Sequence, residues 1–306
     1  MSSQGSTKAI FAALGANVGI AITKFVAAAI SGSASMLAEA IHSVADSGNQ
    51  VLLLIGGKRA AREASKTHPF GYGRRRYVYA FMVSIVLFSV GGMFSIVEGF
   101  NKLSHPHELE NAWLPLLVLG VSILLESFSL YTALKAAKEE RGRTSLVKYI
   151  RHAKSPELPV VLLEDMAALL GLVFAFVGVG MTVLSHDAIW DAIGTLAIGF
   201  LLVVVAVILG IETSSLLIGE GATDKDDRAI REALESSAGV DRIIHMKTLY
   251  LGPDELMVAA KIAVPAKASA QDIAKTIDDA EAKVRKAVHS ARVIYLEPDI
   301  LRSAKN

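Results

Sequence analysis

The stretch ASMLAEAIHSVADSGNQVLLLI, residues 34–55, combines a membrane-spanning length with ionisable side chains. A helix needs about 20 residues to cross the hydrocarbon core of a bilayer. This one carries Glu39, His42 and Asp46, and an ionisable group inside a membrane costs roughly 3 kcal/mol on insertion scales. We therefore predict a transmembrane helix whose polar side chains face a bundle interior or a water-filled cavity.

Apolar runs of similar length surround this stretch. Hydrophobic residues make up 52% of the 306-residue chain, and they are concentrated in blocks. The first run lacks a small-residue cleavage site, so we interpret it as a membrane span and not as a signal peptide. The sequence predicts six transmembrane helices, at residues 8–30, 34–55, 77–100, 112–134, 158–184 and 188–209.

Basic residues in the loops predict the orientation. Lysines and arginines cluster after the second and fourth runs, whereas the other loops hold a single lysine. The positive-inside rule puts both basic loops in the cytoplasm, and an even number of spans puts both termini there too. We expect a multi-pass protein of a bacterial inner (plasma) membrane. The basic residues are Lys58, Arg59, Arg62, Lys66, Arg74, Arg75 and Arg76, then Lys135, Lys138, Arg141, Arg143, Lys148, Arg151 and Lys154.

The composition changes after Gly219. Residues 224–237 and 268–289 have helical periodicity, whereas 241–251, 255–264 and 291–296 have the pattern of strands. The order αββαβ predicts a small ferredoxin-like cytoplasmic domain. We predict a transmembrane domain at 1–218 and a dimerisation domain at 219–306. Because so small a domain has a modest core, we expect a homodimer.

The chain contains no cysteine, so any metal site must use His, Asp, Glu, Asn or water. His42 and Asp46 are four residues apart and share one helical face, and Glu164 and Asp165 lie near the start of the fifth run. One divalent cation held between the two helices would offset their charges. The alternative is a polar contact that only joins the helices.

Several other charged residues in the predicted spans each have two possible roles. Glu39 either supports the site, as a hydrogen-bond partner or proton carrier, or lies at the membrane surface. Glu98 and Glu126 are expected to be structural or to line a cavity. Lys24 either pairs with these acids or extends its ammonium to the membrane surface.

Two motifs carry a resemblance to a known family. AEAIHSVADS at 38–47 is similar to the second-span signature of the cation diffusion facilitators, and HPFGYG at 68–73 is similar to their HPFGHG loop. The six spans and the αββαβ domain resemble the same family over almost the whole chain. The segment VLLED at 161–165 most resembles the zinc-transporter-nine branch.

The resemblance implies a tetrahedral metal site with two ligands on the second span and two on the fifth. His42, Asp46 and Asp165 match ligand positions, whereas the fourth falls on Val161, which cannot bind a metal. Glu164 is three residues further on, so either Glu164 or water completes the set. Among accessory family sites, only His68 in the loop and His245 in the C-terminal domain match, while Lys261 and Leu296 replace expected ligands.

These observations predict an exporter of a divalent transition metal, zinc first, in exchange for protons. Metal and protons compete for the same ligands, which gives a local reason for coupling. Manganese or iron(II) export by the same mechanism is the alternative, with cobalt and cadmium also possible cargo. A metal-binding membrane scaffold or sensor that does not transport is the other class. We expect no enzyme activity, since the sequence has no HExxH-like pair, and no resident cofactor. The net charge of only +1 gives no reason to expect a nucleic-acid partner.

Overall fold

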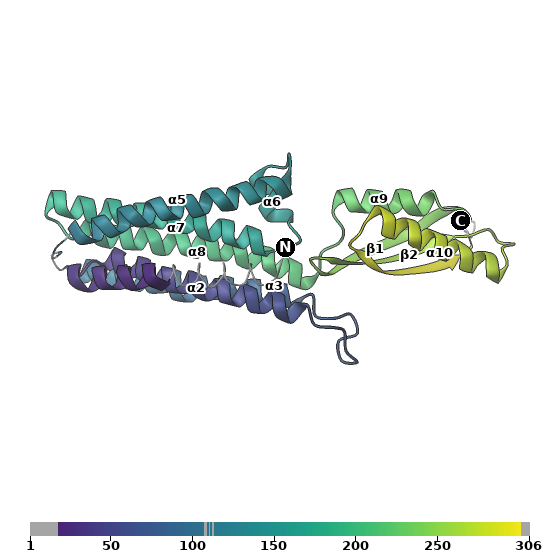
Figure 1. Ribbon diagram of the computed structural model, residues 1–306, viewed down its shortest axis with the longest axis horizontal. Helices are drawn as coiled ribbons and strands as arrows, with labels where there is room; N and C mark the ends of the chain where they lie inside the picture. Colours follow the sequence, from purple (N-terminus) through teal and green to yellow (C-terminus); the bar gives the residue numbers. More distant parts are fainter. Residues whose placement is uncertain (1–17, 107–108, 110, 112, 301–306) are drawn as a thin grey trace, which may run out of the picture. The chain divides into compact units, whose positions relative to one another are not determined.

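The computed structural model describes residues 18–106, 109, 111 and 113–300. These residues form two compact units, each described by itself. The first unit spans Met1–Gly57 and Val78–Thr213, and the second spans Lys58–Tyr77 and Ser214–Asn306. Figure 1 shows the first as a bundle of long helices and the second as a small sheet with two helices. The placement of the loop 58–77 in the second unit was not anticipated from the sequence.

Four helices in the described part of the chain are long and apolar enough to cross a membrane. The first is built from α3 (Arg75–Val86), η1 (Leu87–Met93) and α4 (Phe94–Ser104), and the others are α5 (Trp113–Arg141), α7 (Glu157–Ser185) and α8 (Ile189–Ile218). They confirm four of the predicted spans. The polar α2 (Ala34–Ala60) covers the predicted second span, and a helix over Val18–Ser31 covers the described part of the first. Residues 8–17 of that span lie outside the described residues.

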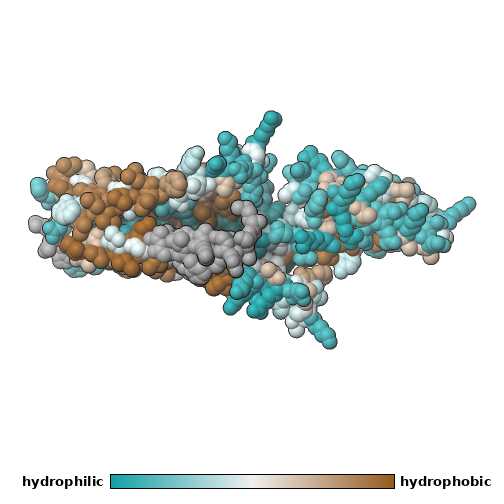
Figure 2. Space-filling model, viewed as in Figure 1, coloured by the Kyte–Doolittle hydropathy of each residue, from teal (hydrophilic) through white to brown (hydrophobic). Residues whose placement is uncertain are grey.

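Apolar side chains cover the outside of the first unit. Figure 2 shows hydrophobic surface over these helices, whereas the second unit is mostly hydrophilic. Leu124, Phe128 and Phe200 are exposed by 73%, 71% and 68%. Large exposed side chains of this kind are stable against lipid and not against water. The chain is therefore a multi-pass membrane protein.

Small residues bring α8 close to its neighbours. A Cβ atom on Gly178 of α7 would lie 2.9 Å from the carbonyl oxygen of Trp190 in α8. On its other side, a Cβ on Gly199 of α8 would lie 2.8 Å from the backbone nitrogen of Ile96 in α4. Membrane helices associate through such close backbone approaches, because lipid provides no hydrophobic force between them.

Two elements of the first unit were missed by the sequence analysis. The seven residues of η1 form a π-helix, whose wider turns leave no clear signature in a uniformly apolar run. The short α6 (Leu146–His152) lies in the predicted loop after α5. Ser145 caps it by accepting a hydrogen bond from the backbone nitrogen of Lys148, and Tyr149 packs with Ala137 of α5 and Leu162 of α7.

The second unit confirms the predicted order of elements. It contains α9 (Asp224–Glu235), β1 (Arg242–Gly252), β2 (Glu255–Ala263), α10 (Ala270–Ala287) and β3 (Ala291–Asp299). The sheet order is β1-β2-β3, with β1 antiparallel and β3 parallel to β2. β2, α10 and β3 thus form an unsplit βαβ unit. The ferredoxin-like description needs correction here, because that fold places another strand between the two parallel ones.

Residues 58–77 belong to the second unit and contact its sheet near the turn between β1 and β2. Arg76 Nη1 lies 2.8 Å from Asp254 Oδ2 at the turn between β1 and β2. A Cβ on Gly73 would lie 2.9 Å from the carbonyl oxygen of Leu251, so only glycine allows this approach. Ser269 and Asp272 form a capping box at the start of α10, and both of its hydrogen bonds are present. The hydrogen bonds from the Ser269 hydroxyl and backbone keep the pKa of Asp272 below its ordinary value.

Candidate metal site

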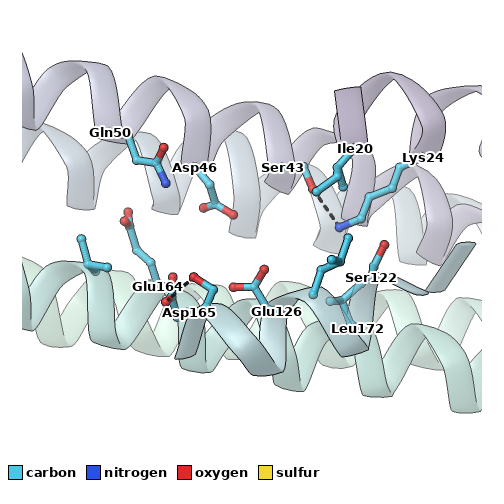
Figure 3. Close-up of a pocket in the computed structure, with 13 residues that line it drawn as sticks. Ile20, Lys24, Ser43, Asp46, Gln50, Ser122, Glu126, Glu164, Asp165 and Leu172 are labelled. Atoms are coloured by element: carbon cyan, nitrogen blue, oxygen red, sulfur yellow. Dashed lines mark hydrogen bonds between the residues drawn. The ribbon is translucent and has the colours of Figure 1, made fainter. Parts of the chain in front are cut away.

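Four helices surround a cavity of about 120 Å³ in the first unit. The lining comes from the helix Val18–Ser31, α2, α5 and α7, and four of its side chains are carboxylic acids. Figure 3 shows Asp46 pointing across the gap toward Glu164, Asp165 and Glu126. A cavity of this size has room for a metal ion with a few waters, since one water occupies about 30 Å³. The lining residues are Ile20, Lys24, Ser43, Asp46, Gln50, Ser122, Leu125, Glu126, Ser129, Val161, Glu164, Asp165 and Leu172.

His42 and Asp46 lie on α2 as their spacing predicts. His42 Nδ1 is 3.5 Å from Asp46 Oδ1. The imidazole of His42 is buried, and neither ring nitrogen has a hydrogen-bond partner among the described residues. Asp46 lines the cavity, but His42 is not among its lining residues. The structure therefore places Asp46 in the wall of the cavity. His42 lies next to Asp46 but does not reach the cavity.

Glu164 and Asp165 of α7 both line the cavity, and each is held by a neighbouring helix. Asn49 of α2 donates a hydrogen bond from Nδ2 to Glu164 Oε1 at 2.7 Å. Ser129 of α5 donates one from Oγ to Asp165 Oδ2 at 3.0 Å. Val161 also lines the cavity, so the apolar residue stands at the wall where the family pattern has a ligand.

Lys24 is buried and does not extend to the membrane surface. Its Nζ lies 3.1 Å from Glu39 Oε2 and donates a hydrogen bond to Ser43 Oγ at 2.8 Å. The side chain of Glu39 is fully buried. Lys24 therefore pairs with an acid, as one of its two expected roles requires, and Glu39 is its buried partner. Glu164 accepts its hydrogen bond from Asn49 and not from Lys24.

Glu126 of α5 lines the same cavity, in agreement with one of its two expected roles. In Figure 3 its carboxylate points toward the gap between the helices. Asp46, Glu126, Glu164 and Asp165 together give the cavity strong negative potential when they are ionised. Such a set of oxygen donors attracts a divalent cation.

The donors are near one another but are not assembled. Within the described ranges, no group of three His, Asp or Glu side chains is arranged to hold a metal ion. The convergence predicted for His42, Asp46 and Asp165 is therefore not present as a formed site in this conformation. Several buried polar atoms on α2 have no hydrogen-bond partner among the described residues: Glu39 Oε1, His42 Nδ1 and Nε2, Asp46 Oδ1 and Asn49 Oδ1.

The accessory residue His68 belongs to a folded loop. Its ring lies 4.5 Å from the ring of Tyr72, and its Nδ1 is 3.1 Å from the hydroxyl of Thr67. The Tyr72 hydroxyl lies 3.1 Å from that of Ser65, and His68 and Ser65 form an isolated β-bridge. These contacts explain His68 as a residue that shapes the loop.

The accessory residue His245 faces a lysine. In the β1–β2 register it is paired with Lys261. Lys261 Nζ lies 3.0 Å from Glu297 Oε1 and 3.0 Å from Asp299 Oδ2 on β3. Hydrogen bonds to Asp299 and Glu297 raise the pKa of Lys261 above its ordinary value. The ammonium of Lys261 thus forms ion pairs with the two carboxylates that a metal ion at His245 would need as ligands.

Asn49 and Ser129 are polar side chains that the sequence analysis missed. Asn49 is three residues after Asp46 and seven after His42, so its position on the polar face of α2 was readable from the spacing. Asn49 is fully buried and bonds to a predicted ligand. Ser129 had no such signal, because serine is common in membrane helices and its partner Asp165 lies 36 residues away.

Comparisons with known proteins agree with this architecture. Residues 10–218 match the model of the cation efflux transmembrane domain. The proton-coupled zinc antiporter SLC30A9 of mouse mitochondria is 30% identical over 85% of this chain and 46% of its own length. Metal tolerance protein C4 of Arabidopsis thaliana is 31% identical over 85% of this chain and 57% of its own length. The cation-efflux pump FieF of Pectobacterium atrosepticum is 24% identical over 90% of this chain and 86% of its own length.

The chain belongs to the cation efflux family, and the resemblance to the cation diffusion facilitators is confirmed. The relatives above are named as an antiporter, a tolerance protein and an efflux pump, in agreement with the expectation that the chain is not an enzyme. The chain spans about half the length of the animal and plant relatives, at 46% and 57%. Among solved structures, a nickel form of the MamM C-terminal domain covers 26% of this chain and all of its own, at 18% identity and a TM-score of 0.25.

Proposed function

We propose that the protein exports a divalent transition metal, zinc first, across a membrane in exchange for protons. The observation that carries this proposal is the cavity lined by Asp46, Glu126, Glu164 and Asp165 between helices of a bundle. Ionisable groups at such a position mark ion pathways in membrane proteins. The mouse and Arabidopsis relatives, named a zinc antiporter and a metal tolerance protein, support the same class of cargo.

The proposed site consists of His42 and Asp46 on α2 with Asp165 and Glu164 on α7. Zinc takes four ligands with bonds of about 2 Å, so α2 and α7 must approach for the metal to be held. Movement of one group of helices against another then opens the site to alternate sides. We propose six membrane spans for this motion, with the helix Val18–Ser31 and α2 as the first two.

Proton coupling follows from the ligand types. Carboxylate and imidazole bind a metal only when deprotonated. On the side with more protons, protonation of the ligands expels the metal, and on the other side deprotonation restores the site. The donor set contains three carboxylates and one imidazole, which is harder than a set rich in histidine. Manganese and iron(II) are therefore the second choice of cargo.

The test is metal flux into proteoliposomes that contain the purified protein and an imposed pH gradient. Zinc, manganese, iron(II), cobalt and cadmium are compared in the same preparation. Metal uptake that increases with the gradient and is accompanied by proton movement supports the proposal. Metal binding with no flux would assign the protein to the scaffold or sensor class instead.

Glu164→Gln is expected to weaken zinc binding about tenfold and manganese binding more than zinc binding. In the unchanged protein Asn49 Nδ2 lies 2.7 Å from Glu164 Oε1, and the amide oxygen of glutamine can still accept this hydrogen bond. The substitution removes one negatively charged oxygen ligand from the site. Isothermal titration of the protein in detergent measures both affinities. Adding Val161→His to this variant places an imidazole in the wall of the cavity. The double variant should regain tighter binding of zinc than of manganese. Unchanged selectivity in Glu164→Gln would make Glu164 a structural partner of Asn49.

We also propose a homodimer held by the residues from about 219 onward, which bind little or no metal. The proposal rests on the small core of the second unit and on Lys261, whose ammonium lies 3.0 Å from both Glu297 and Asp299. The full chain should keep the mass of a dimer in detergent after chelator treatment, measured by light scattering. Dissociation by chelator, reversed by zinc, would contradict it.

The domain limits 1–218 and 219–306 remain part of this proposal, as do both cytoplasmic termini. The relatives from mouse, frog, human and orangutan are named mitochondrial proteins, and they give no support to the predicted bacterial inner membrane. Protease protection in sealed vesicles, applied to sites in the two basic loops, measures the orientation.

A further inference from the structure

One cation is built into the cavity that we assign to the metal. Lys24 lines the same cavity as Asp46, Glu126, Glu164 and Asp165. We propose that Lys24 is a tethered cation that opposes the divalent cargo, so that the site binds metal weakly enough to release it. This inference rests on the proposed function, whose site it deepens.

The ammonium is held at a defined place. Lys24 Nζ lies 3.1 Å from Glu39 Oε2 and 2.8 Å from Ser43 Oγ. Both partners are on α2, on successive turns, and Ser43 directly follows His42. Lys24 is exposed by only 4% and Glu39 by 0%, so water screens this charge poorly. In Figure 3 the Lys24 side chain reaches from its own helix to Ser43 beside the gap.

The chemistry of lysine limits what this group can do there. A protonated ammonium has three donors and no lone pair, so it cannot bind a metal ion. It acts by its charge, attracting the carboxylates and repelling a divalent cation in the same cavity. Glu39 offsets that repulsion while the pair is intact. The strength of the pair therefore adjusts how strongly the four remaining acids attract the cargo.

A second buried lysine shows what a structural role looks like in this bundle. Lys102 is exposed by 6%, and its Nζ donates a hydrogen bond to the backbone oxygen of Gly32 at 2.9 Å. That bond satisfies an acceptor next to a chain reversal, where Gly32 has a φ of +67°. Lys102 is not among the residues that line the cavity. It provides a matched control for the removal of a buried ammonium.

The test is a cycle of substitutions in the full-length protein, with zinc and manganese as probes. Lys24→Met leaves the Glu39 carboxylate without its cation and should tighten metal binding about tenfold. Glu39→Gln leaves the ammonium without its anion and should weaken binding by a similar factor. The double variant removes both charges and should bind within about threefold of the unchanged protein. Affinity is measured by titration in detergent.

Flux in proteoliposomes separates this role from a structural one. Lys24→Met is expected to lower both the KM and the maximal rate, because tighter binding slows release, whereas damage to the fold lowers the rate without lowering the KM. Lys24→Arg keeps the charge and should restore both values to within about threefold. Lys102→Met should leave the affinity unchanged.

The result that overturns the inference is equal affinity for metal in Lys24→Met and Lys102→Met, or tighter binding in Glu39→Gln. If Lys24→Met does not fold, the contrast between weaker binding in Glu39→Gln and nearly unchanged binding in Lys24→Arg still tests the inference. If the unchanged protein binds metal but carries none across the membrane, the proposed function fails, while the affinities of the cycle still test the charge effect.

Discussion

Asp46→Asn and Asp165→Asn are each expected to reduce metal flux about a hundredfold or more, with the protein still folded. Both acids line the cavity, from α2 and from α7. Asparagine keeps the shape of the side chain and removes the charge that compensates the cargo. The Ser129 hydroxyl, 3.0 Å from Asp165 Oδ2, can still donate to the amide oxygen, so the packing of α5 on α7 should survive. Flux in proteoliposomes and thermal unfolding in detergent are measured on the same samples.

Glu98→Gln is the matched control for these variants. Glu98 lies in α4, within the first unit, but it is not among the residues that line the cavity. Its replacement removes an acid from a membrane helix without altering the proposed site, and flux should stay within about threefold of the unchanged protein. Normal flux in Asp165→Asn would show that α7 supplies no essential ligand, and the proposed site would have to be withdrawn.

Asp191→Ala is expected to destabilise the helix bundle by about 3 kcal/mol. Asp191 of α8 is fully buried and serves as a cap for α2, although it lies far along the chain. Its carboxylate accepts hydrogen bonds from the Ser33 hydroxyl at 2.8 Å and from the backbone nitrogen of Ala34 at 2.7 Å. It also accepts from the backbone and hydroxyl of Ser35. Alanine removes the acceptor that these buried donors share.

Thermal unfolding followed by tryptophan fluorescence measures this effect. A loss of about 3 kcal/mol corresponds to a fall in Tm of roughly 6–12 °C for a chain of this size. Asp187→Ala is the control, since Asp187 is exposed and accepts a bond from the nearby backbone nitrogen of Ile189. It should cost less than about 1 kcal/mol. Equal Tm values for the two variants would contradict the role of Asp191 in α8 as a cap for α2.

The helices and strands could be predicted because their patterns are local. Apolar runs of membrane length stand at α5, α7 and α8, and period-two patterns stand at β1 and β2. Two kinds of element escaped this approach. The seven-residue α6 is too short to show a helical period, and η1 differs from its flanking helices only in the width of its turns.

The candidate site was predicted in part for the same reason. Asp46, Glu164 and Asp165 were chosen because acids are rare in membrane helices, and all three line the cavity. The Lys24–Glu39 pair and the Asn49–Glu164 bond depend on which helices are neighbours, and residue spacing within one helix does not give that information. The orientation of His42 also depends on how closely α2 approaches α7.

The π-helix η1 divides one long membrane helix into two segments of different helical phase. A widened turn holds about one residue more than an α-turn, and each residue advances an α-helix by about 100°. Removing a single residue from Leu87–Met93 would therefore rotate α4 by about that angle relative to α3. Gly99, where a Cβ atom would lie 2.7 Å from the Leu196 side chain of α8, would leave its contact. An alignment of this helix with relatives that lack the widened turn must accordingly carry a one-residue gap between residues 87 and 93.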